Sequence, residues 1–182
     1  MNEDTLYIEQ FLEGKEAGFE ILVRKYQDRV LNIVYSLIGK DRESEDIAQE
    51  VFLKVYQGLK FFKKHSQFST WLYRITVNTT YGFLRKRGRF VRDEGAIEGG
   101  AAAGEGPRGT LLIKERAAML RAALEKVPVK FRAAMVLKDI EGLSYSEIAK
   151  ILRCSIGTVE SKIYRARQFL KAELVKEGGE AI

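Results

Sequence analysis

The spacing of the apolar residues constrains the fold more than any other feature of this sequence. From Phe19 to Leu37 they recur every three or four positions, and the same period returns over 44–59 and 69–87. This is the period of one face of an α-helix, whereas no useful length alternates as a strand does. With a shorter helix over 5–12, the first block is predicted to be a helical bundle. Gly39 is expected to stop a helix and Ser44 to cap the next one.

The composition changes sharply after this block. Residues 95–109, GAIEGGAAAGEGPRG, lack the large apolar side chains that offset the entropy of ordering. Helical periodicity resumes over 111–174, with interruptions at 127–128 and 141–142. We therefore expect an all-α protein of two small helical domains, 1–92 and 113–182, joined by a flexible acidic Gly/Ala-rich linker over 93–112.

Charge and cysteine content narrow the partners and the compartment. The net charge is +6, and residues 60–92 contain nine Lys and Arg but no Asp or Glu, which favours an acidic partner. The single Cys154 excludes an internal disulfide and favours a reducing compartment. The N-terminus does not resemble a secretory signal, and no apolar run approaches the roughly 20 residues that span a bilayer. We expect a cytoplasmic protein.

The segment GLSYSEIAKILRCSIGTVESKIYRAR predicts a helix-turn-helix. Ser144 and Glu147 have the spacing of a capping box, residues 154–157 form a tight turn, and Thr158 is the expected N-cap of the second helix. Such a second helix enters the major groove of DNA by its N-terminal half. A solvated surface helix is the plainer alternative. The residues expected to face DNA are Arg153, Ser155, Thr158, Glu160, Ser161, Lys162, Tyr164, Arg165 and Arg167.

The basic segment after residue 60 also contains many aromatic residues. Unpaired bases stack on aromatic rings while Lys and Arg follow the phosphates, so this composition suits melted DNA. Trp71, Leu72 and Ile75 are expected in the core instead. The sequence contains no set of nucleophile and base, no Gly-rich phosphate loop and no metal-ligand cluster. We expect no enzymatic activity, cofactor, metal or small-molecule substrate.

Three motifs together resemble a known family. SEDIAQEVFLKVY (44–56) and FSTWLYRITVNTTYGFLRKRGR (68–89) resemble region 2 of bacterial sigma factors of the extracytoplasmic-function group, and residues 124–167 resemble region 4. The resemblance implies a factor that binds core RNA polymerase and directs promoter-specific transcription initiation. Region 4 would bind the minus-35 element, and region 2 would melt the minus-10 element and capture its unpaired bases. An anti-sigma factor, often membrane-bound, is a further implied partner.

The resemblance also assigns residues to surfaces. Region 2 would dock on the clamp helices of the largest polymerase subunit, and region 4 on the flap. The clamp-binding residues implied are Asp46, Gln49, Glu50, Leu53 and Tyr56. The residues implied for the minus-10 element are Phe62, Lys63, Lys64, His65, Asn78, Tyr81, Arg85 and Lys86.

Several points stay open at this stage. Many relatives have a basic residue where this chain has Glu160, so the minus-35 sequence is undetermined. The acidic linker is either a plain tether or a segment that follows the nucleic-acid path through the polymerase. The rival functions are a stand-alone helix-turn-helix regulator that binds duplex operators as a dimer, and a single-strand RNA-binding protein or nucleic-acid chaperone.

Overall fold

The computed structural model describes residues 3–39, 43–63, 66–88 and 118–176. Every regular element in these ranges is helical, which confirms the all-α prediction. The expected linker, the chain before residue 3 and the last six residues lie outside them. None of the helices described is long and apolar enough to span a membrane. The first domain contains α1 (Glu3–Leu12), α2 (Ala17–Ile38), α3 (Glu43–Gly58), the 3₁₀ turn η1 (Leu59–Phe61) and α4 (Phe68–Lys86).

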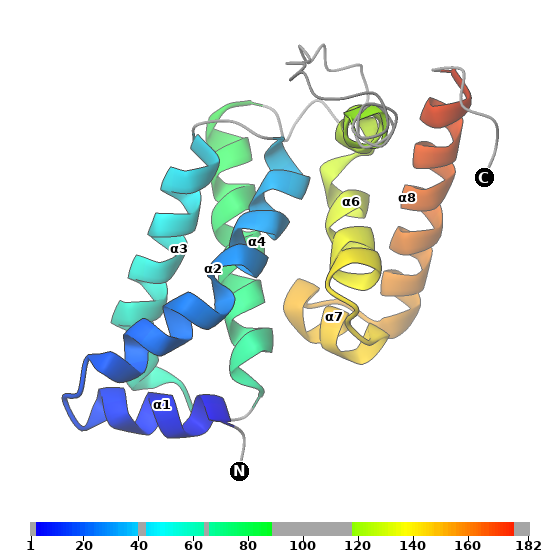
Figure 1. The fold of residues 1–182 in the computed structure, drawn as a ribbon. Helices are drawn as coiled ribbons and strands as arrows, with labels where there is room; N and C mark the ends of the chain where they lie inside the picture. The colour runs from blue at the N-terminus through cyan, green and yellow to red at the C-terminus, as the bar shows by residue number, and fades with distance from the viewer. Residues whose placement is uncertain (1–2, 40–42, 64–65, 89–117, 177–182) are drawn as a thin grey trace, which may run out of the picture.

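Helices α2, α3 and α4 form a three-helix bundle, and α1 lies across one end of it (Figure 1). Their buried faces are the apolar stripes that the periodicity predicts. The bundle must also bury threonines of α4, and two of these hydroxyls donate to the carbonyl one turn earlier, Thr76 to Leu72 at 3.0 Å and Thr80 to Thr76 at 2.8 Å. The largest fully buried side chains of this domain are Ile8, Leu22, Ile33, Leu37, Leu59, Leu72 and Tyr73.

A buried carboxylate fixes α1 on the bundle. Asp4 is 2% exposed, and it accepts from Tyr26 Oη at 2.7 Å and from Lys25 Nζ at 2.7 Å. Burial, together with the hydrogen bond to Asp4, raises the pKa of Tyr26, so its hydroxyl remains a donor. The hydrogen bond to Asp4 likewise raises the pKa of Lys25. A buried charge is tolerated only where it is hydrogen-bonded or paired, and Asp4 is both.

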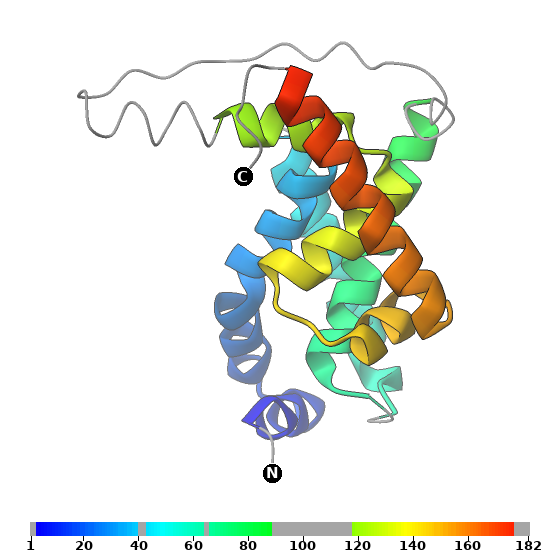
Figure 2. The ribbon, with the colours of Figure 1, turned by 90° about the vertical axis from the view of Figure 1, so that its right-hand side faces the viewer.

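The second domain contains a helical stretch over 118–126, α6 (Val129–Met135), a π-helical turn η2 (Val136–Ile140), α7 (Tyr145–Leu152) and α8 (Ile156–Lys176). Helices α6 and α7 both pack on α8, as Figure 2 shows from the side. Val127, Val159, Ile163 and Ala166 are buried on the shared face. The last two helices have the order and short connection of a helix-turn-helix.

The helix ends confirm part of the sequence prediction and correct the rest. Ser144 and Glu147 form the predicted capping box, and the backbone N–H of Ser144 donates to the Glu147 carboxylate at 2.8 Å. Ser44 is not an N-cap, because α3 begins one residue earlier, at Glu43. The buried hydroxyl of Ser44 instead donates to the Gly39 carbonyl. Thr158 is not one either, because α8 begins at Ile156 and Ser155 Oγ accepts from the Thr158 backbone N–H at 3.2 Å.

The two domains pack against each other, α4 on α7 and α2 on α6, and we call this the closed arrangement. One cluster of buried apolar residues runs through both. Around its edge, Arg29 donates to the Tyr73 hydroxyl at 3.4 Å, and Glu141 of the second domain lies beside both. Burial raises the pKa of Glu141, although Arg29 opposes the shift.

One buried guanidinium joins the domains directly. Arg132 is 3% exposed; it donates to the Leu37 carbonyl of α2 at 2.8 Å and to the Val127 carbonyl at 2.8 and 3.0 Å, and it also bonds the Glu125 carbonyl. We call Arg132 and these three carbonyls the Arg132 clasp. Next to it, Gly39 has φ +85°, and a Cβ there would lie 2.6 Å from Glu125 Oε1. Glycine therefore permits both the turn and the close approach.

Replacing Asp4 with Ala should lower the free energy of unfolding by about 3 kcal/mol, because the Tyr26 hydroxyl and the Lys25 ammonium lose their shared acceptor. Chemical denaturation followed by circular dichroism measures this. Glu3→Ala is the matched control, since Glu3 is exposed and meets Lys25 at 3.3 Å. It should cost less than about 1 kcal/mol. Equal losses in the two variants would contradict the role given to Asp4.

Replacing Arg132 with Lys should separate the domains, because the three carbonyls are reached by three different nitrogens of the guanidinium and a single compact ammonium cannot occupy all three places. We expect a loss of about 2–4 kcal/mol, since each unsatisfied buried group costs about 1–3 kcal/mol. Denaturation should then show two transitions, and small-angle scattering a larger radius of gyration. Arg121→Lys, at an exposed position of the preceding helix, should change neither. A single transition with wild-type dimensions would contradict the clasp.

Candidate nucleic-acid interface

The residues predicted to bind the polymerase lie together on the outer face of α3. Asp46, Gln49, Leu53 and Tyr56 recur at steps of three and four, Glu50 lies next to Gln49, and all five are exposed. Leu53 is 57% exposed although it is a large apolar residue. This face lies on the opposite side of the bundle from α6, α7 and α8 (Figure 1), so the closed arrangement leaves it uncovered.

Two of these side chains have neighbours that fix their positions. Tyr56 packs edge-on against the rings of Phe11 and Phe19, with both ring centroids 5.1 Å away. Glu50 pairs with Lys54 one turn later at 2.7 Å. Neighbouring Phe52 packs against the core, while Leu53 makes no comparable contact. The surface therefore combines carboxylates with a preorganised aromatic ring and an exposed leucine.

The residues predicted to contact the minus-10 element lie on and beside α4. Asn78 is exposed and lines a hollow of about 350 Å³ with Lys54, Gly58, Trp71, Ile75 and Thr79. Lys54 Nζ donates to Thr79 Oγ1 at 3.2 Å, which fixes one wall. The amide of Asn78 can donate and accept at this opening, as hydrogen bonding to a base edge requires.

Other predicted members of this surface are less uniform. Phe62 is half-buried, with its ring 5.1 Å from that of Trp71, while Lys63, Arg85 and Lys86 are exposed. Tyr81 is half-buried, and its hydroxyl donates to the Val129 carbonyl of the second domain at 3.4 Å. In the closed arrangement Tyr81 therefore faces protein. Lys64 and His65 lie outside the described residues.

The core prediction for Trp71 and Ile75 is wrong in part. Leu72 is fully buried, whereas Trp71 and Ile75 are half-buried: they pack against the core and also line surface hollows. The sequence reasoning also left out Arg74, which lines a hollow beside Trp71. Their spacing was the available signal, because Trp71, Arg74 and Asn78 are successive members of one helical stripe.

The second helix of the helix-turn-helix presents most of its predicted DNA contacts to solvent. Tyr164 is 65% exposed, and Glu160, Ser161, Arg165 and Arg167 of α8 are also exposed. Arg153, before the turn, has φ +52°, the left-handed region that a non-glycine residue rarely adopts. The exposed predicted residues are Arg153, Ser155, Thr158, Glu160, Ser161, Tyr164, Arg165 and Arg167.

Three of the basic residues also have structural partners. Lys162 is half-buried and donates to the Lys130 carbonyl at 3.2 Å, and both it and Arg165 lie over the ring of Phe131. Arg167 pairs with Asp139 of the π-helical turn at 2.6 Å, and this hydrogen bond raises the pKa of Arg167. These contacts orient α8 on α6 and η2. Among the described residues no cluster of three or more His, Cys, Asp or Glu could hold a metal.

This geometry defines a class of protein: a two-domain helical factor with a helix-turn-helix on one side and a basic aromatic helix on the other. The comparisons with known proteins identify the family. Residues 22–90 match the model of Sigma-70 region 2, and residues 117–170 match that of Sigma-70, region 4.

Curated relatives match along almost the whole length. The chain is 35% identical to the RNA polymerase sigma-H factor of Pseudomonas aeruginosa, over 94% of each chain, and 37% identical to the ECF RNA polymerase sigma-E factor of Escherichia coli K12, over 91% of each. The chain belongs to the extracytoplasmic-function sigma factors. It is a promoter-specific initiation factor for RNA polymerase and not an enzyme.

Two solved structures share the architecture. One is CnrH in complex with the cytosolic domain of CnrY, with a TM-score of 0.72 and 25% identity, covering 96% of this chain and 99% of that one. The other is the sigma factor RpoE in complex with the anti-sigma factor NepR from Bartonella quintana, with a TM-score of 0.70 and 29% identity, covering 86% and 96%. Both matches extend over the two domains.

Proposed function

We propose that this sigma factor binds core polymerase through the outer face of α3, captures minus-10 bases on α4 and reads the minus-35 element with α8. The observation that carries this assignment is the separation of the three surfaces. Each lies on a different helix, and each has the chemistry that its partner requires: carboxylates with an exposed leucine, an amide beside aromatic rings, and a helix-turn-helix. The family match does not favour a stand-alone dimeric regulator.

The closed arrangement must open for this function. The positions that give the minus-10 and minus-35 elements their names differ by about 25 base pairs, which corresponds to roughly 85 Å at 3.4 Å per base pair. The closed packing instead holds α4 against α7, the first helix of the helix-turn-helix. The 29 residues over 89–117 could reach at most about 100 Å when fully extended. The length of chain between the domains therefore permits the separation that the promoter requires.

We also propose that an anti-sigma factor holds this chain in the cytoplasm. Support comes from RpoE, which was solved in complex with the anti-sigma factor NepR and matches both domains. An inhibitor that binds the closed arrangement would leave Tyr81 against Val129 and α4 against α7. Differential affinity for the closed form is sufficient to keep the factor inactive.

Replacing Leu53 with Ala should weaken binding to core polymerase about tenfold, since an exposed apolar anchor at an interface centre contributes about 1–2 kcal/mol. Fluorescence anisotropy of labelled protein titrated with core polymerase measures this. Leu6→Ala is the matched control, because Leu6 is a 44% exposed leucine on α1. Its affinity should equal that of the wild type. If Leu6→Ala weakens binding as much, α3 is not the docking face.

Replacing Asn78 with Ala should lower run-off transcription about tenfold while leaving core binding unchanged, because the captured base loses its polar partner. Run-off transcription is measured with core polymerase and promoter fragments. In a separate binding assay, the wild-type protein without core should bind duplex DNA weakly. Asn32→Ala, at an exposed site on α2, is the control and should transcribe normally. A template with a preformed minus-10 bubble should partly rescue Asn78→Ala. Tight, specific duplex binding by the protein alone, with no transcripts on adding core, would overturn the proposed function.

A further inference from the structure

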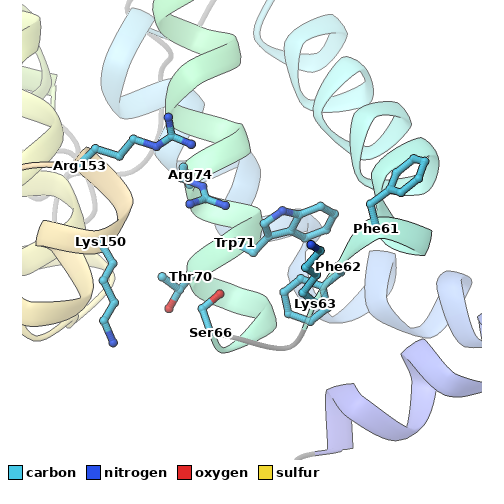
Figure 3. Close-up of a pocket in the computed structure, with 9 residues that line it drawn as sticks. All are labelled: Phe61, Phe62, Lys63, Ser66, Thr70, Trp71, Arg74, Lys150 and Arg153. Carbon is cyan, nitrogen blue, oxygen red and sulfur yellow. The ribbon is translucent and has the colours of Figure 1, made fainter.

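A second hollow lies between the two domains and has no assigned role. It has a volume of about 650 Å³, within the range of small-molecule sites. Its walls come from the first domain, through η1, the described residues 62–63 and 66, and α4, and from the C-terminal end of α7 (Figure 3). The nine described lining residues are Phe61, Phe62, Lys63, Ser66, Thr70, Trp71, Arg74, Lys150 and Arg153.

The charge of this hollow is one-sided. Lys63, Arg74, Lys150 and Arg153 contribute four cations, and none of the described lining residues is acidic. In Figure 3 Arg74 extends from α4 of the first domain, and Arg153 reaches the same hollow from the end of α7 in the second domain. Within the described part of the chain, neither of these guanidinium groups has a hydrogen bond or an ion pair with another residue. Cations from both domains that line one hollow repel each other, so an anion bound among them would stabilise the closed arrangement.

The other walls are chemically different from the cationic one. Trp71 and Phe62 present half-buried rings with Lys63 beside them, and in the view of Figure 3 Ser66 and Thr70 lie between these rings and Lys150. Aromatic rings stack on nucleobases, hydroxyls hydrogen-bond to sugars, and arginine binds phosphate with two parallel hydrogen bonds. The order of ring, hydroxyl and cation across the hollow matches base, sugar and phosphates.

We propose that this hollow binds a free nucleoside triphosphate, with the base against Trp71 and Phe62 and the phosphates between Arg74, Lys150 and Arg153. A DNA strand is a poorer occupant of the same place. A strand would continue along α4, but Tyr81 there is half-buried and bonded to Val129 of the second domain. A single nucleotide needs no such path.

The site exists only while the domains are closed, because Lys150 of α7 and Arg153, which follows it, supply two of the phosphate-binding cations. Nucleotide therefore favours the closed arrangement by mass action, and opening of the domains releases it. Part of the same surface, Phe62 and Lys63, belongs to the residues proposed for the minus-10 element. Bound nucleotide and captured promoter bases thus exclude each other.

Trp71 is the only tryptophan of the chain, so it reports directly on the site. Titrating the full-length protein with GTP or ATP should quench its fluorescence saturably. The double variant Lys150→Gln/Arg153→Gln should raise the dissociation constant at least about tenfold, since it removes charge-assisted hydrogen bonds to phosphate. Lys171→Gln, an exposed lysine on α8, is the charge control and should bind as the wild type does.

Three further measurements distinguish a nucleoside triphosphate from other ligands of this hollow. Inorganic triphosphate should compete only weakly with GTP, because it lacks the base; equal affinity would overturn the nucleotide assignment. Tight binding of a five-nucleotide single strand with no response to GTP or ATP would overturn it in favour of DNA. Arg132→Lys keeps every lining residue but should lose affinity in proportion to its open fraction. Unchanged affinity in a variant whose scattering shows open domains would overturn the domain-bridging site.

Discussion

A single buried guanidinium provides the most extensive hydrogen bonding at the boundary of the closed arrangement. Arg132 donates to carbonyls of its own domain at Val127 and Glu125 and to Leu37 at the end of α2, so one side chain satisfies helix ends in both domains. Helix ends leave carbonyls without intrahelical partners, and burying them unpaired is costly. A planar five-donor group suits this task and lysine does not. The contact between α2 and α6, and the approach of Glu125 to Gly39, follow from this geometry.

This packing divides the functional surfaces unequally. The outer face of α3 and the exposed side of α8 remain open to solvent, while Tyr81 on α4 faces the second domain. A polymerase subunit could therefore meet α3 before the domains part. Opening would then expose the surface that acts last, on melted DNA. The order in which polymerase and melted DNA are bound therefore follows from the position of α4 at the boundary between the domains and of α3 away from it.

The sequence predicts the helices better than it predicts their ends. Apolar periodicity is a local property and correctly located α2, α4 and the helix-turn-helix, and the Ser144 capping box depends on two residues of one turn. Thr158 was misassigned because Ser155, three residues earlier, accepts from its backbone N–H, and Ser44 was misassigned because its buried hydroxyl donates to the Gly39 carbonyl instead of capping α3. The Arg132 clasp was out of reach, since its acceptor at Leu37 is 95 residues away and periodicity says nothing about such pairs. Asp46 and Leu53, in contrast, lie on one face of one helix, so local periodicity was enough to predict that they share a surface.

The cations at the domain boundary oppose the clasp. Closure brings Lys63 and Arg74 of the first domain and Lys150 and Arg153 of the second to one hollow, and like charges oppose closure, while Arg132 and the shared apolar cluster favour it. The net preference is a small difference between opposing contributions, so modest binding energies can shift it. A polyanion that bridges the two arginines favours closure, whereas promoter DNA, which engages the domains at separate sites, favours opening. The same positive charge that serves DNA binding in the open form therefore makes the closed form sensitive to the anion that lies between its domains.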